Sequence, residues 1–382
     1  MLRIAQLIES GGPGGAEQVV VDLAIGLQES GARSVVFLPR DGEGWLARQL
    51  TGTGIAVEYF ELNTPVSPAC ARSLALAFEH HQIDVAHSHE FSMALYGAWA
   101  SWLAGVHHVI TMHGSRYYAG RLQRRAAMRA AVGVSDAVVA VSRSLADGIS
   151  RDLLVRRSRI QVIANGVRPA NADGSHVRQQ LGIGPDDRLI VAVGNLYPVK
   201  GHAYLIEAIA ELAERHPRLH LAIAGRGHLE CELLARARRR NISQRVHLLG
   251  LRSDVGAVLA AADVFALPSL SEGLPLALLE AMFAARPIVA TEVGEVGAAL
   301  GRGDAGLLVP PGNVSALADA LDQLLTNPER ARTLAAHAQQ RASSEYDVSH
   351  MIRRYRSLYD HALSSSQLPV GGLSPEHTRS NP

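Results

Sequence analysis

Short apolar runs rich in β-branched residues alternate with longer segments of helical periodicity along the first part of the chain. The helical segments include residues 17–30 and 70–81. The apolar runs occupy residues 3–8, 33–39, 55–60, 84–89, 107–113 and 136–142. Nearly continuous apolar strands that alternate with helices are typical of a parallel sheet covered by helices on both faces. The pattern therefore predicts an α/β fold with a doubly wound sheet.

The same alternation restarts after residue 187. Residues 188–201, RLIVAVGNLYPVKG, match residues 3–15, RIAQLIESGGPGG, in the order of strand, glycine-bearing loop and helix. Further apolar runs follow at residues 219–227, 246–251, 263–269, 287–291 and 306–310. The break lies in residues 167–187, a segment rich in Pro, Gly, Asp and Asn. We therefore predict a second doubly wound domain, and ligands of such sheets bind beyond the carboxyl ends of the strands.

A length of 382 residues agrees with two domains rather than one core. The predicted organisation is an N-terminal domain at residues 1–168, a second domain at 169–345, a C-terminal helix at 346–363 that packs back on the first domain, and a tail at 364–382. The tail is polar and rich in Gly, Pro and Ser, so we expect it to be disordered.

Composition narrows the class of protein. The net charge is +1, which argues against binding of polyanions through bulk charge. Cys70 and Cys231 are far apart and form no metal or redox spacing, as expected in a reducing compartment. The N-terminus has no signal-peptide pattern, and the apolar segment at 93–106 is too short to span a membrane. We expect a soluble cytoplasmic protein.

Lys200 is the only lysine, and all other basic residues are arginine. It follows the strand predicted at 189–195 and precedes a helix predicted at 204–216, which places it at the carboxyl edge of the second sheet. A lysine ammonium is a compact charge on a flexible stem, suited to a phosphate oxygen. A surface lysine without a ligand is the alternative. We favour a phosphate contact because strand, loop and helix here have the order of a phosphate-binding site.

A second candidate segment, EGLPLALLE, runs from Glu272 to Glu280 after the strand at 263–269. Pro275 suits the first turn of a helix, whose free N–H groups near Leu274 would then point at a diphosphate. Glu280, further along this helix, can accept hydrogen bonds from two adjacent hydroxyl groups. Without such a ligand, the two glutamates would be a solvated helix face.

Two clusters carry weaker signals. The histidines at 80, 81, 87, 89, 107, 108 and 113 are dense, but they lack the acidic or cysteine partners of a zinc site, so we predict no metal. In RLQRRAAMR, four arginines lie near one helical face, namely Arg121, Arg124, Arg125 and Arg129. They form either a solvated face or a contact with anionic head groups, on the inner face of a membrane, or with a phosphorylated acceptor.

Several motifs in the same order along residues 2–360 resemble the retaining glycosyltransferases of family four, also called group 1, whose two-domain architecture is GT-B. The motifs are GGPGGAE at 11–17, DVAHSH at 84–89, TMHG at 111–114, NGV at 165–167, VGNLYPVKG at 193–201, AGRG at 224–227 and EGLPLALLE at 272–280. The resemblance implies two Rossmann-like domains that face each other across a cleft. It also implies a nucleotide-sugar donor and a role in the synthesis of cell-surface polysaccharide or another glycoconjugate.

The resemblance assigns roles to matching residues. Lys200 would hold the donor diphosphate, with Gly225 and the backbone near Leu274 also in the donor site. Glu280 would bind the ribose hydroxyls, and Glu272 would contact hydroxyls of the transferred sugar. His113 would lie beside that sugar. In the first domain, Gly14 and Gly15 would allow the loop to approach donor and acceptor closely.

The chain departs from the family pattern at three positions. Asn195 stands where the family usually has an arginine that shares the diphosphate with the lysine. Glu295 and Ala298 stand where the family tends to have glycine and glutamate. Asn195 and Ala298 keep open a non-catalytic protein that binds a sugar nucleotide or glycan. A nucleotide-sugar epimerase is a second alternative, because it can share the same architecture.

The assigned residues also indicate a mechanism. The residues expected near the reacting carbon are His113, Gly114 and the loop at Gly15, and none of them is a carboxylate. The absence of a carboxylate there favours front-face attack with retention of configuration. No Asp-x-Asp segment stands in the predicted cleft loops, so we expect Lys200 and a helix N-terminus to replace a divalent metal.

Overall fold

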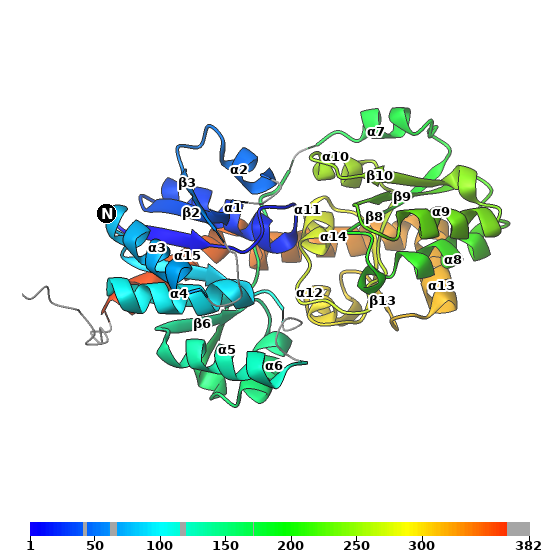
Figure 1. Ribbon diagram of the computed structural model, residues 1–382. Coiled ribbons are helices and arrows are strands. Elements are labelled where there is room, and N and C mark those ends of the chain that lie inside the picture. Colours follow the sequence, from blue (N-terminus) through cyan, green and yellow to red (C-terminus); the bar gives the residue numbers. More distant parts are fainter. Residues whose placement is uncertain (41–43, 62–66, 115–119, 171, 365–382) are drawn as a thin grey trace, which may run out of the picture. The chain divides into compact units, whose positions relative to one another are not determined.

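The computed structural model describes residues 1–40, 44–61, 67–114, 120–170 and 172–364. They form two compact units, Met1–Ile163 with Met351–Pro382, and Ala164–His350 (Figure 1). The first unit therefore ends at Ile163 instead of residue 168, and the second extends to His350 instead of residue 345. The tail predicted at 364–382 lies outside the described residues except for Ser364, which ends the last helix.

The first unit contains a seven-stranded sheet in which every pair of neighbouring strands is parallel. Its strands are β1 (Arg3–Leu7), β2 (Arg33–Pro39), β3 (Ala56–Phe60), β4 (Val85–His89), β5 (His107–Met112), β6 (Ala137–Ala140) and β7 (Ile160–Val162). They are ordered β3-β2-β1-β4-β5-β6-β7, so the chain reverses its direction of winding between β1 and β4. The predicted strands are confirmed. The three-residue strand β7 was not predicted, because it is too short to give an apolar run.

Helices cover both faces of this sheet. They are α1 (Gly15–Glu29), α2 (Trp45–Leu50), α3 (Pro68–His80), α4 (Glu90–Ala104), α5 (Leu122–Val134) and α6 (Arg143–Leu153). Local sequence fixes the ends of several of them. The Ser67 hydroxyl accepts a hydrogen bond from the backbone N–H of Cys70 at the start of α3, and Pro68 occupies the first turn. Helix α4 ends at Gly105 in the left-handed conformation.

The second unit repeats the architecture with six parallel strands ordered β10-β9-β8-β11-β12-β13. The strands are β8 (Arg188–Val193), β9 (Leu219–Ala224), β10 (Val246–Gly250), β11 (Val264–Leu267), β12 (Ile288–Thr291) and β13 (Leu307–Val309). The helices are α7 (Ser175–Gln180), α8 (His202–Leu212), α9 (Glu230–Arg239), α10 (Val255–Ala260), α11 (Leu276–Phe283), α12 (Val296–Ala299), α13 (Val314–Thr326) and α14 (Pro328–Glu345).

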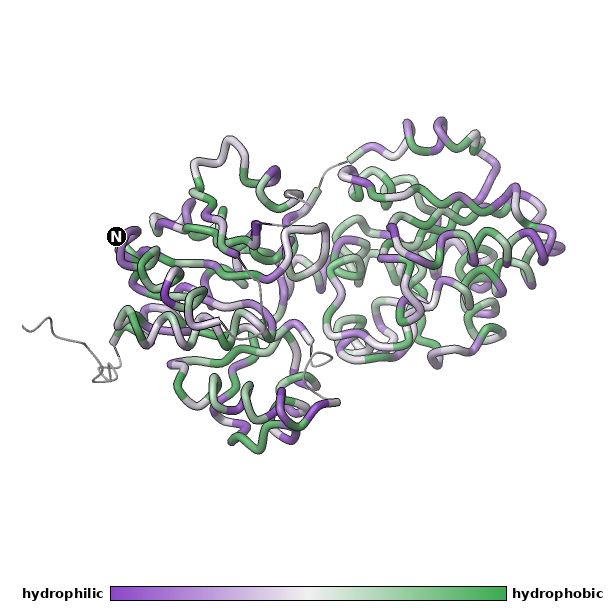
Figure 2. Tube along the Cα trace, viewed as in Figure 1, coloured by the Kyte–Doolittle hydropathy of each residue, from purple (hydrophilic) through white to green (hydrophobic). Residues whose placement is uncertain are grey.

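Successive residues of β8 build separate cores on the two faces of this sheet. Leu189 belongs to the core that also contains Phe265 and Leu278. Its neighbour Ile190 belongs to the opposite core, which contains Leu205. Such strands are buried on both faces, which explains the continuous apolar runs in the sequence, and Figure 2 shows hydrophobic stretches along the strands of both units.

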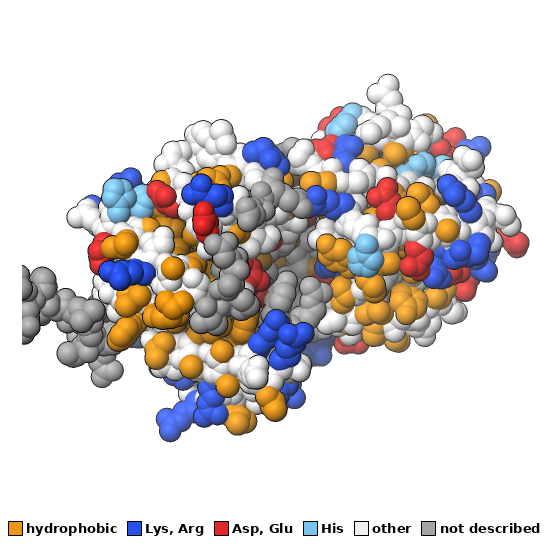
Figure 3. All heavy atoms as spheres, viewed as in Figure 1, with side chains coloured by type: hydrophobic (Ala, Val, Ile, Leu, Met, Phe, Trp, Pro, Cys, Tyr) orange, Lys and Arg blue, Asp and Glu red, His pale blue; other side chains and the backbone are white. Residues whose placement is uncertain are grey.

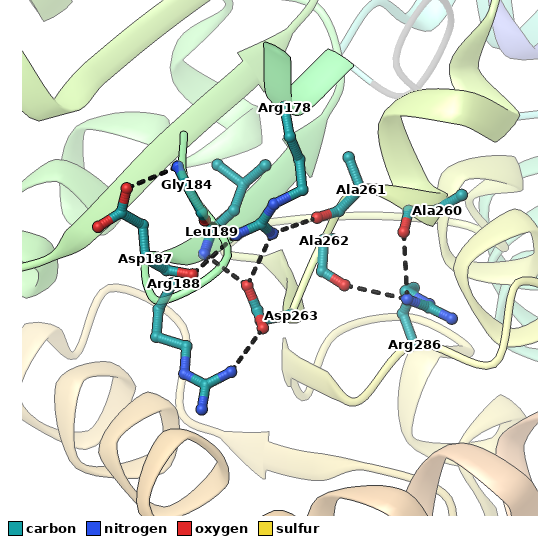
Figure 4. Close-up of polar contacts among 10 residues, drawn as sticks. All are labelled: Arg178, Gly184, Asp187, Arg188, Leu189, Ala260, Ala261, Ala262, Asp263 and Arg286. Carbon is teal, nitrogen blue, oxygen red and sulfur yellow. Dashed lines mark hydrogen bonds and ion pairs between the residues drawn. The ribbon is translucent and has the colours of Figure 1, made fainter. Parts of the chain in front are cut away.

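The segment predicted as the break between the domains carries α7, and Arg178 anchors this helix to the second unit (Figure 4). The Arg178 guanidinium donates to the carbonyls of Ala261, Gly184 and Asp187 at 2.9, 3.0 and 2.7 Å. It also donates to the Asp263 carboxylate at 3.1 Å. These contacts lie at the amino ends of β8 and β11, on the opposite edge of the sheet from Lys200, so the anchor stabilises the unit away from the candidate site.

Helix α15 (Val348–Ser364) contributes residues from Met351 onward to the first unit. Tyr355 and Tyr359 on this helix are almost completely buried. The Tyr355 hydroxyl lies 3.0 Å from Oγ1 of Thr111, and the Tyr359 hydroxyl lies 2.7 Å from Nδ1 of His87. The last described helix is therefore tied by polar contacts to the central strands β4 and β5.

Candidate active site

Candidate residues that are far apart in the sequence of the second domain lie together at the carboxyl edge of the second sheet. In the strand order β10-β9-β8-β11-β12-β13, winding reverses between β8 and β11. Loops that leave neighbouring strands in opposite directions open a crevice at such a point, where α/β sheets bind their ligands. Lys200 follows β8 and Glu272 follows β11, so both lie at the reversal point.

Lys200 and Glu272 form an ion pair there. The Lys200 ammonium lies 2.7 Å from Oε1 of Glu272, and the Ser269 hydroxyl donates to the same oxygen at 2.7 Å. The Glu272 side chain is 9% exposed and the Lys200 side chain is 26% exposed. A lysine side chain that is partly exposed can exchange its carboxylate partner for a phosphate oxygen. The pair therefore provides a cation and an acceptor at one point.

Two glycines allow the loops at this edge to approach closely. A Cβ on Gly201 would lie 1.9 Å from the carbonyl oxygen of Pro268, and the φ of Gly201 is 68°. A Cβ on Gly225 would lie 2.0 Å from the carbonyl oxygen of Gly194. Only glycine fits such contacts without a backbone shift. Gly225 thus holds the loop after β9 against the loop that leads to Lys200.

Helix α11 begins at Leu276, with Pro275 as its N-cap. Pro275 therefore precedes the helix and does not lie in its first turn, where the sequence had suggested it would lie. The difference is small, because the N–H groups of Leu276 and Ala277 still precede the first bond of the helix, which the Leu278 N–H donates to the Pro275 carbonyl at 3.2 Å. The carbonyl of Leu274 accepts a hydrogen bond from the Asn165 side chain at 3.1 Å, which fixes the backbone before the helix. Glu280 is half-buried in the second turn of α11.

The residues that depart from the family pattern surround the same edge. Asn195 lies in the loop after β8, Glu295 is the N-cap of α12, and Ala298 is exposed within α12. Arg226, which was not among the candidate residues predicted from the sequence, lies in the loop after β9. Its carbonyl accepts a hydrogen bond from the N–H of Leu196 at 2.8 Å. The AGRG motif contains this arginine, so the signal was present in the sequence.

In the first unit the corresponding reversal point lies between β1 and β4. The loop after β1 leads to Gly14, the N-cap of α1, and to Gly15, the exposed first residue of that helix. A Cβ on Gly15 would meet no atom within 4 Å, whereas one on Gly14 would meet the Glu17 carboxylate at 2.2 Å. Burial, the largest influence, raises the pKa of Glu17. Because no atom lies near a Cβ at Gly15, the glycine loop leaves open space at this residue.

His113 follows β5 at the same edge and is held at two points. Its Nε2 lies 3.1 Å from Nδ1 of His89, and its backbone N–H donates to the Glu90 carboxylate at 3.1 Å. Burial lowers the pKa of His113 to about 4, so the imidazole is neutral at pH 7. Glu90 has a φ of 69°, which is unusual for a residue with a side chain and often marks a functional site.

Glu90 corrects one sequence-based expectation. The residues expected near the reacting carbon included no carboxylate, but folding brings Glu90 against the backbone of His113. The sequence could have suggested this contact, because Glu90 directly follows the strand adjacent to β5. A carboxylate therefore lies at this edge of the first sheet, where the sequence had suggested none.

The arginines of residues 121–129 do not form one free face. Arg121 and Arg129 are exposed, but the guanidinium of Arg125 lies 3.9 Å from Asp152 and that of Arg124 lies 5.8 Å from the centre of the Phe91 ring. On the face in Figure 3, charged side chains of both signs are interspersed with apolar ones. Within the described ranges, no helix has the length and apolar content needed to cross a bilayer.

The buried histidines of the cluster are hydrogen-bonded to neighbouring side chains. His87 contacts Thr111, and His108 contacts Ser88 and Ser135. In the part of the chain that the structure describes, no three His, Cys, Asp or Glu side chains gather in a way that would hold a metal ion. Burial lowers the pKa of His108 to about 3. His87 and His108 are therefore neutral components of the core.

Two family models match the chain. The model described as Glycosyltransferase Family 4 matches residues 13–171, and the model described as Glycosyl transferases group 1 matches residues 175–341. The two matches together span most of both units. They confirm the resemblance inferred from the ordered motifs.

Individual relatives agree with these matches. The chain is 30% identical over 273 residues to the alpha-D-kanosaminyltransferase of Streptomyces kanamyceticus. The aligned region covers 67% of this chain and 71% of that protein. It is 25% identical over 303 residues to the N-acetyl-alpha-D-glucosaminyl L-malate synthase of Bacillus anthracis. The aligned region covers 77% of this chain and 79% of that protein. The crystal structure of Anabaena Alr3699/HepE in complex with UDP-glucose superimposes with a TM-score of 0.83 at 25% identity, covering 94% and 100% of the two chains. The chain therefore belongs to the group 1, family 4 glycosyltransferases and has their GT-B fold.

Proposed function

We propose that this glycosyltransferase moves a sugar from a nucleotide-sugar donor to a glycan, lipid-linked or small-molecule acceptor, with retention of the anomeric configuration. The synthesis of a cell-surface polysaccharide or glycoconjugate is the proposed setting. The observation that carries the proposal is the pair of Lys200 and Glu272, 2.7 Å apart at the reversal point of the second sheet. The Lys200 cation suits the diphosphate of a sugar diphosphate, and the Glu272 carboxylate can accept hydrogen bonds from the hydroxyls of its sugar.

Each residue has a proposed task. Lys200 and the first-turn N–H groups of α11 stabilise the negative charge that develops on the departing diphosphate. Glu280 binds the ribose hydroxyls, and Glu272 binds hydroxyls of the transferred sugar. Lys200 would leave Glu272 for the diphosphate when the donor binds, which frees the carboxylate for the sugar. His113 and the loop at Gly15 serve the transferred sugar and the acceptor.

UDP-glucose is the first donor to test, because Anabaena Alr3699/HepE was crystallised with it. A thermal-shift screen against UDP, GDP, ADP and their sugars would identify the nucleotide. A donor present at a hundred times its dissociation constant stabilises the protein by about 2.7 kcal/mol. Mass spectrometry of mixtures with and without acceptor would then separate transfer from epimerisation, which needs no acceptor. A donor that binds and is never turned over would indicate a binding protein.

The two glutamates should give different kinetic defects. Glu280→Gln should raise the donor KM about 3- to 10-fold with little change in kcat, because a ribose contact is present in ground and transition states alike. Glu272→Gln should lower kcat about tenfold, since it acts on the sugar at which charge develops. Steady-state kinetics with varied donor would measure both. The reverse pattern would show that the two roles are exchanged.

Activity should persist in excess EDTA. The proposed charge stabilisation comes from Lys200 and the α11 N-terminus, which are part of the chain and unaffected by chelation. Initial rates with and without EDTA would be compared after removal of bound metal. Loss of activity that magnesium or manganese restores would require a metal in the donor site.

An α-configured donor should give an α-linked product. In the proposed front-face reaction, the leaving diphosphate accepts the proton of the acceptor hydroxyl while Lys200 holds its charge. Proton NMR of the purified product would report the anomeric coupling. A β-linked product would contradict the retaining assignment.

Glu90 provides the decisive comparison for this stereochemistry, because its carboxylate lies beside His113. Under front-face attack, Glu90→Gln should retain measurable transfer and give the same α product. Under double displacement, Glu90→Gln should be inactive, and added azide should restore turnover to a β-glycosyl azide. Formation of that azide would show that the reaction proceeds by double displacement and not by front-face attack.

A further inference from the structure

A buried chain of polar contacts leads from the core of the first unit to His113. Gln6 on β1 and His89 on β4 are both completely buried. Nε2 of His89 lies 2.9 Å from Oε1 of Gln6, and Nδ1 of His89 lies 3.1 Å from Nε2 of His113. The rings of His89 and His113 are nearly parallel, at 22° with centroids 5.4 Å apart. Two residues from the adjacent strands β1 and β4 and one residue directly after the next strand, β5, thus form one hydrogen-bonded line.

Each imidazole in this line carries a single proton. Burial lowers the pKa of His113 to about 4 and lowers that of His89 well below its ordinary value. Nearby histidines lower the pKa of His89 further. A neutral imidazole has one N–H donor and one acceptor nitrogen, and the partners of one nitrogen determine which is which. The ring nitrogen of His89 that carries the proton therefore determines which ring nitrogen of His113 carries its own proton.

The Gln6 carbonyl sets the direction of the line. An amide oxygen accepts a hydrogen bond and cannot donate one, so His89 must carry its proton on Nε2. Nδ1 of His89 is then an acceptor and receives the Nε2–H of His113. Nδ1 of His113 is left as a hydrogen-bond acceptor, and no described residue occupies it.

The surroundings hold both ends of the line in place. The amide nitrogen of Gln6 is buried and has no hydrogen-bond partner among the described residues. The Gln6 side chain lowers the pKa of the Tyr359 hydroxyl against the larger effect of burial, which raises it. At the other end, Glu90 fixes the backbone of His113. The His113 ring is therefore restrained from its backbone and from Nε2, which leaves Nδ1 as its available polar atom.

We infer that Gln6 and His89 are positioning residues that fix His113 in its Nε2–H tautomer, so that Nδ1 accepts a hydrogen bond from a substrate hydroxyl. The tautomer follows from the contacts of the first unit alone. The use of Nδ1 on a sugar or acceptor hydroxyl rests on the proposed function. A histidine held in this way orients a hydroxyl group and does not supply a proton.

The tautomer can be measured directly in the full-length protein. Selective ¹⁵N labelling of histidine and two-bond ¹H–¹⁵N correlation spectra at pH 7.5 distinguish a protonated from an unprotonated ring nitrogen. The spectrum of His113→Asn assigns the His113 signals by their loss. We expect Nε2 of His113 to be protonated and Nδ1 to be unprotonated. A protonated Nδ1 would overturn the inference, since it would mean that the Gln6 amide is reversed and the line runs in the opposite direction.

Kinetics test the consequence for the reaction. Gln6→Met keeps the side-chain volume but removes the acceptor, so His113 should populate both tautomers. We expect kcat to fall about 3- to 10-fold, the effect of one hydrogen bond, with the donor KM within about twofold of wild type. Unchanged kcat together with a mixed His113 tautomer would show that Nδ1 contacts no substrate in the transition state.

His108→Gln is the matched control. His108 is a neutral, buried histidine on β5, but its ring nitrogens contact Ser88 and Ser135 and not His113. This variant should leave the His113 tautomer and kcat unchanged. A tautomer shift in His108→Gln equal to that in Gln6→Met would indicate general loosening of the core and would also overturn the inference.

If Gln6→Met does not fold, the spectrum of the wild-type protein still shows which tautomer His113 adopts. If no donor is turned over at all, the proposed function fails while the tautomer remains measurable.

Discussion

Replacement of Lys200 by alanine is expected to lower kcat/KM for the nucleotide-sugar donor about 100-fold or more. A charge-assisted contact with a phosphate contributes about 1.5–3 kcal/mol, and about 1.4 kcal/mol corresponds to a factor of ten. A second effect adds to the loss. Glu272, only 9% exposed, would remain without its cation at the point where the diphosphate binds. The repulsion between carboxylate and diphosphate should bring the defect to the upper end of this range.

Two further variants separate the contributions. The double variant Lys200→Ala with Glu272→Gln removes the repulsion, so it should bind the donor better than Lys200→Ala alone. Arg218→Ala is a control for loss of a basic residue, because Arg218 forms an exposed ion pair with Asp186 away from the site. It should stay within about twofold of wild type. Wild-type kinetics for Lys200→Ala would exclude the diphosphate assignment.

Replacement of Arg178 by alanine is expected to destabilise the second unit by about 2–4 kcal/mol. Arg178 makes hydrogen bonds to three backbone carbonyls and to Asp263, and both side chains of the ion pair are less than a quarter exposed (Figure 4). Asp263 would keep its contacts with Arg188 and with the Leu189 N–H, so most of the loss comes from three backbone carbonyls that lose a charged donor, at about 1 kcal/mol each. Hydrogen exchange of the β8 amides would measure the change within the full-length protein.

Arg188→Ala provides a control on the same carboxylate. Arg188 donates to the other oxygen of Asp263 at 3.0 Å, but its side chain is 54% exposed. Loss of such an exposed ion pair should cost less than about 1 kcal/mol. Equal destabilisation by the two variants would show that charge on Asp263 matters and that the carbonyl contacts of Arg178 do not. Because Arg178 lies at the amino edge of the sheet, kcat of the folded variant should remain close to wild type.

The fold was largely readable from the chain because parallel strands buried on two faces leave continuous apolar runs. Leu189 and Ile190 illustrate the reason, since consecutive residues enter opposite cores and both must be apolar. The missed strand β7 has three residues, too few for such a run. The boundary of the first unit also differed, because Asn165 and Val167 donate hydrogen bonds to the carbonyls of Leu274 and Tyr346, which hold this segment to the second unit.

The candidate site was only partly readable. Lys200 and Glu272 were found because a unique residue type and a helix-start motif marked loops at strand ends. Ser269, which shares the Glu272 oxygen, was missed because a serine after a strand has no distinctive pattern. Gln6 and His89 were not recognised as partners of His113, since a polar residue within an apolar strand does not indicate what it contacts.

By itself, the sequence determined the α/β class, the repeat of the unit and the loops that carry the chemistry. These features follow from local periodicity and turn chemistry, which act over a few residues. Only the tertiary structure decided which loops meet. The order of strands brought Lys200 to Glu272, Gln6 to His89 and Glu90 to His113. Strand order depends on pairing between distant segments, and a local pattern contains no record of that pairing.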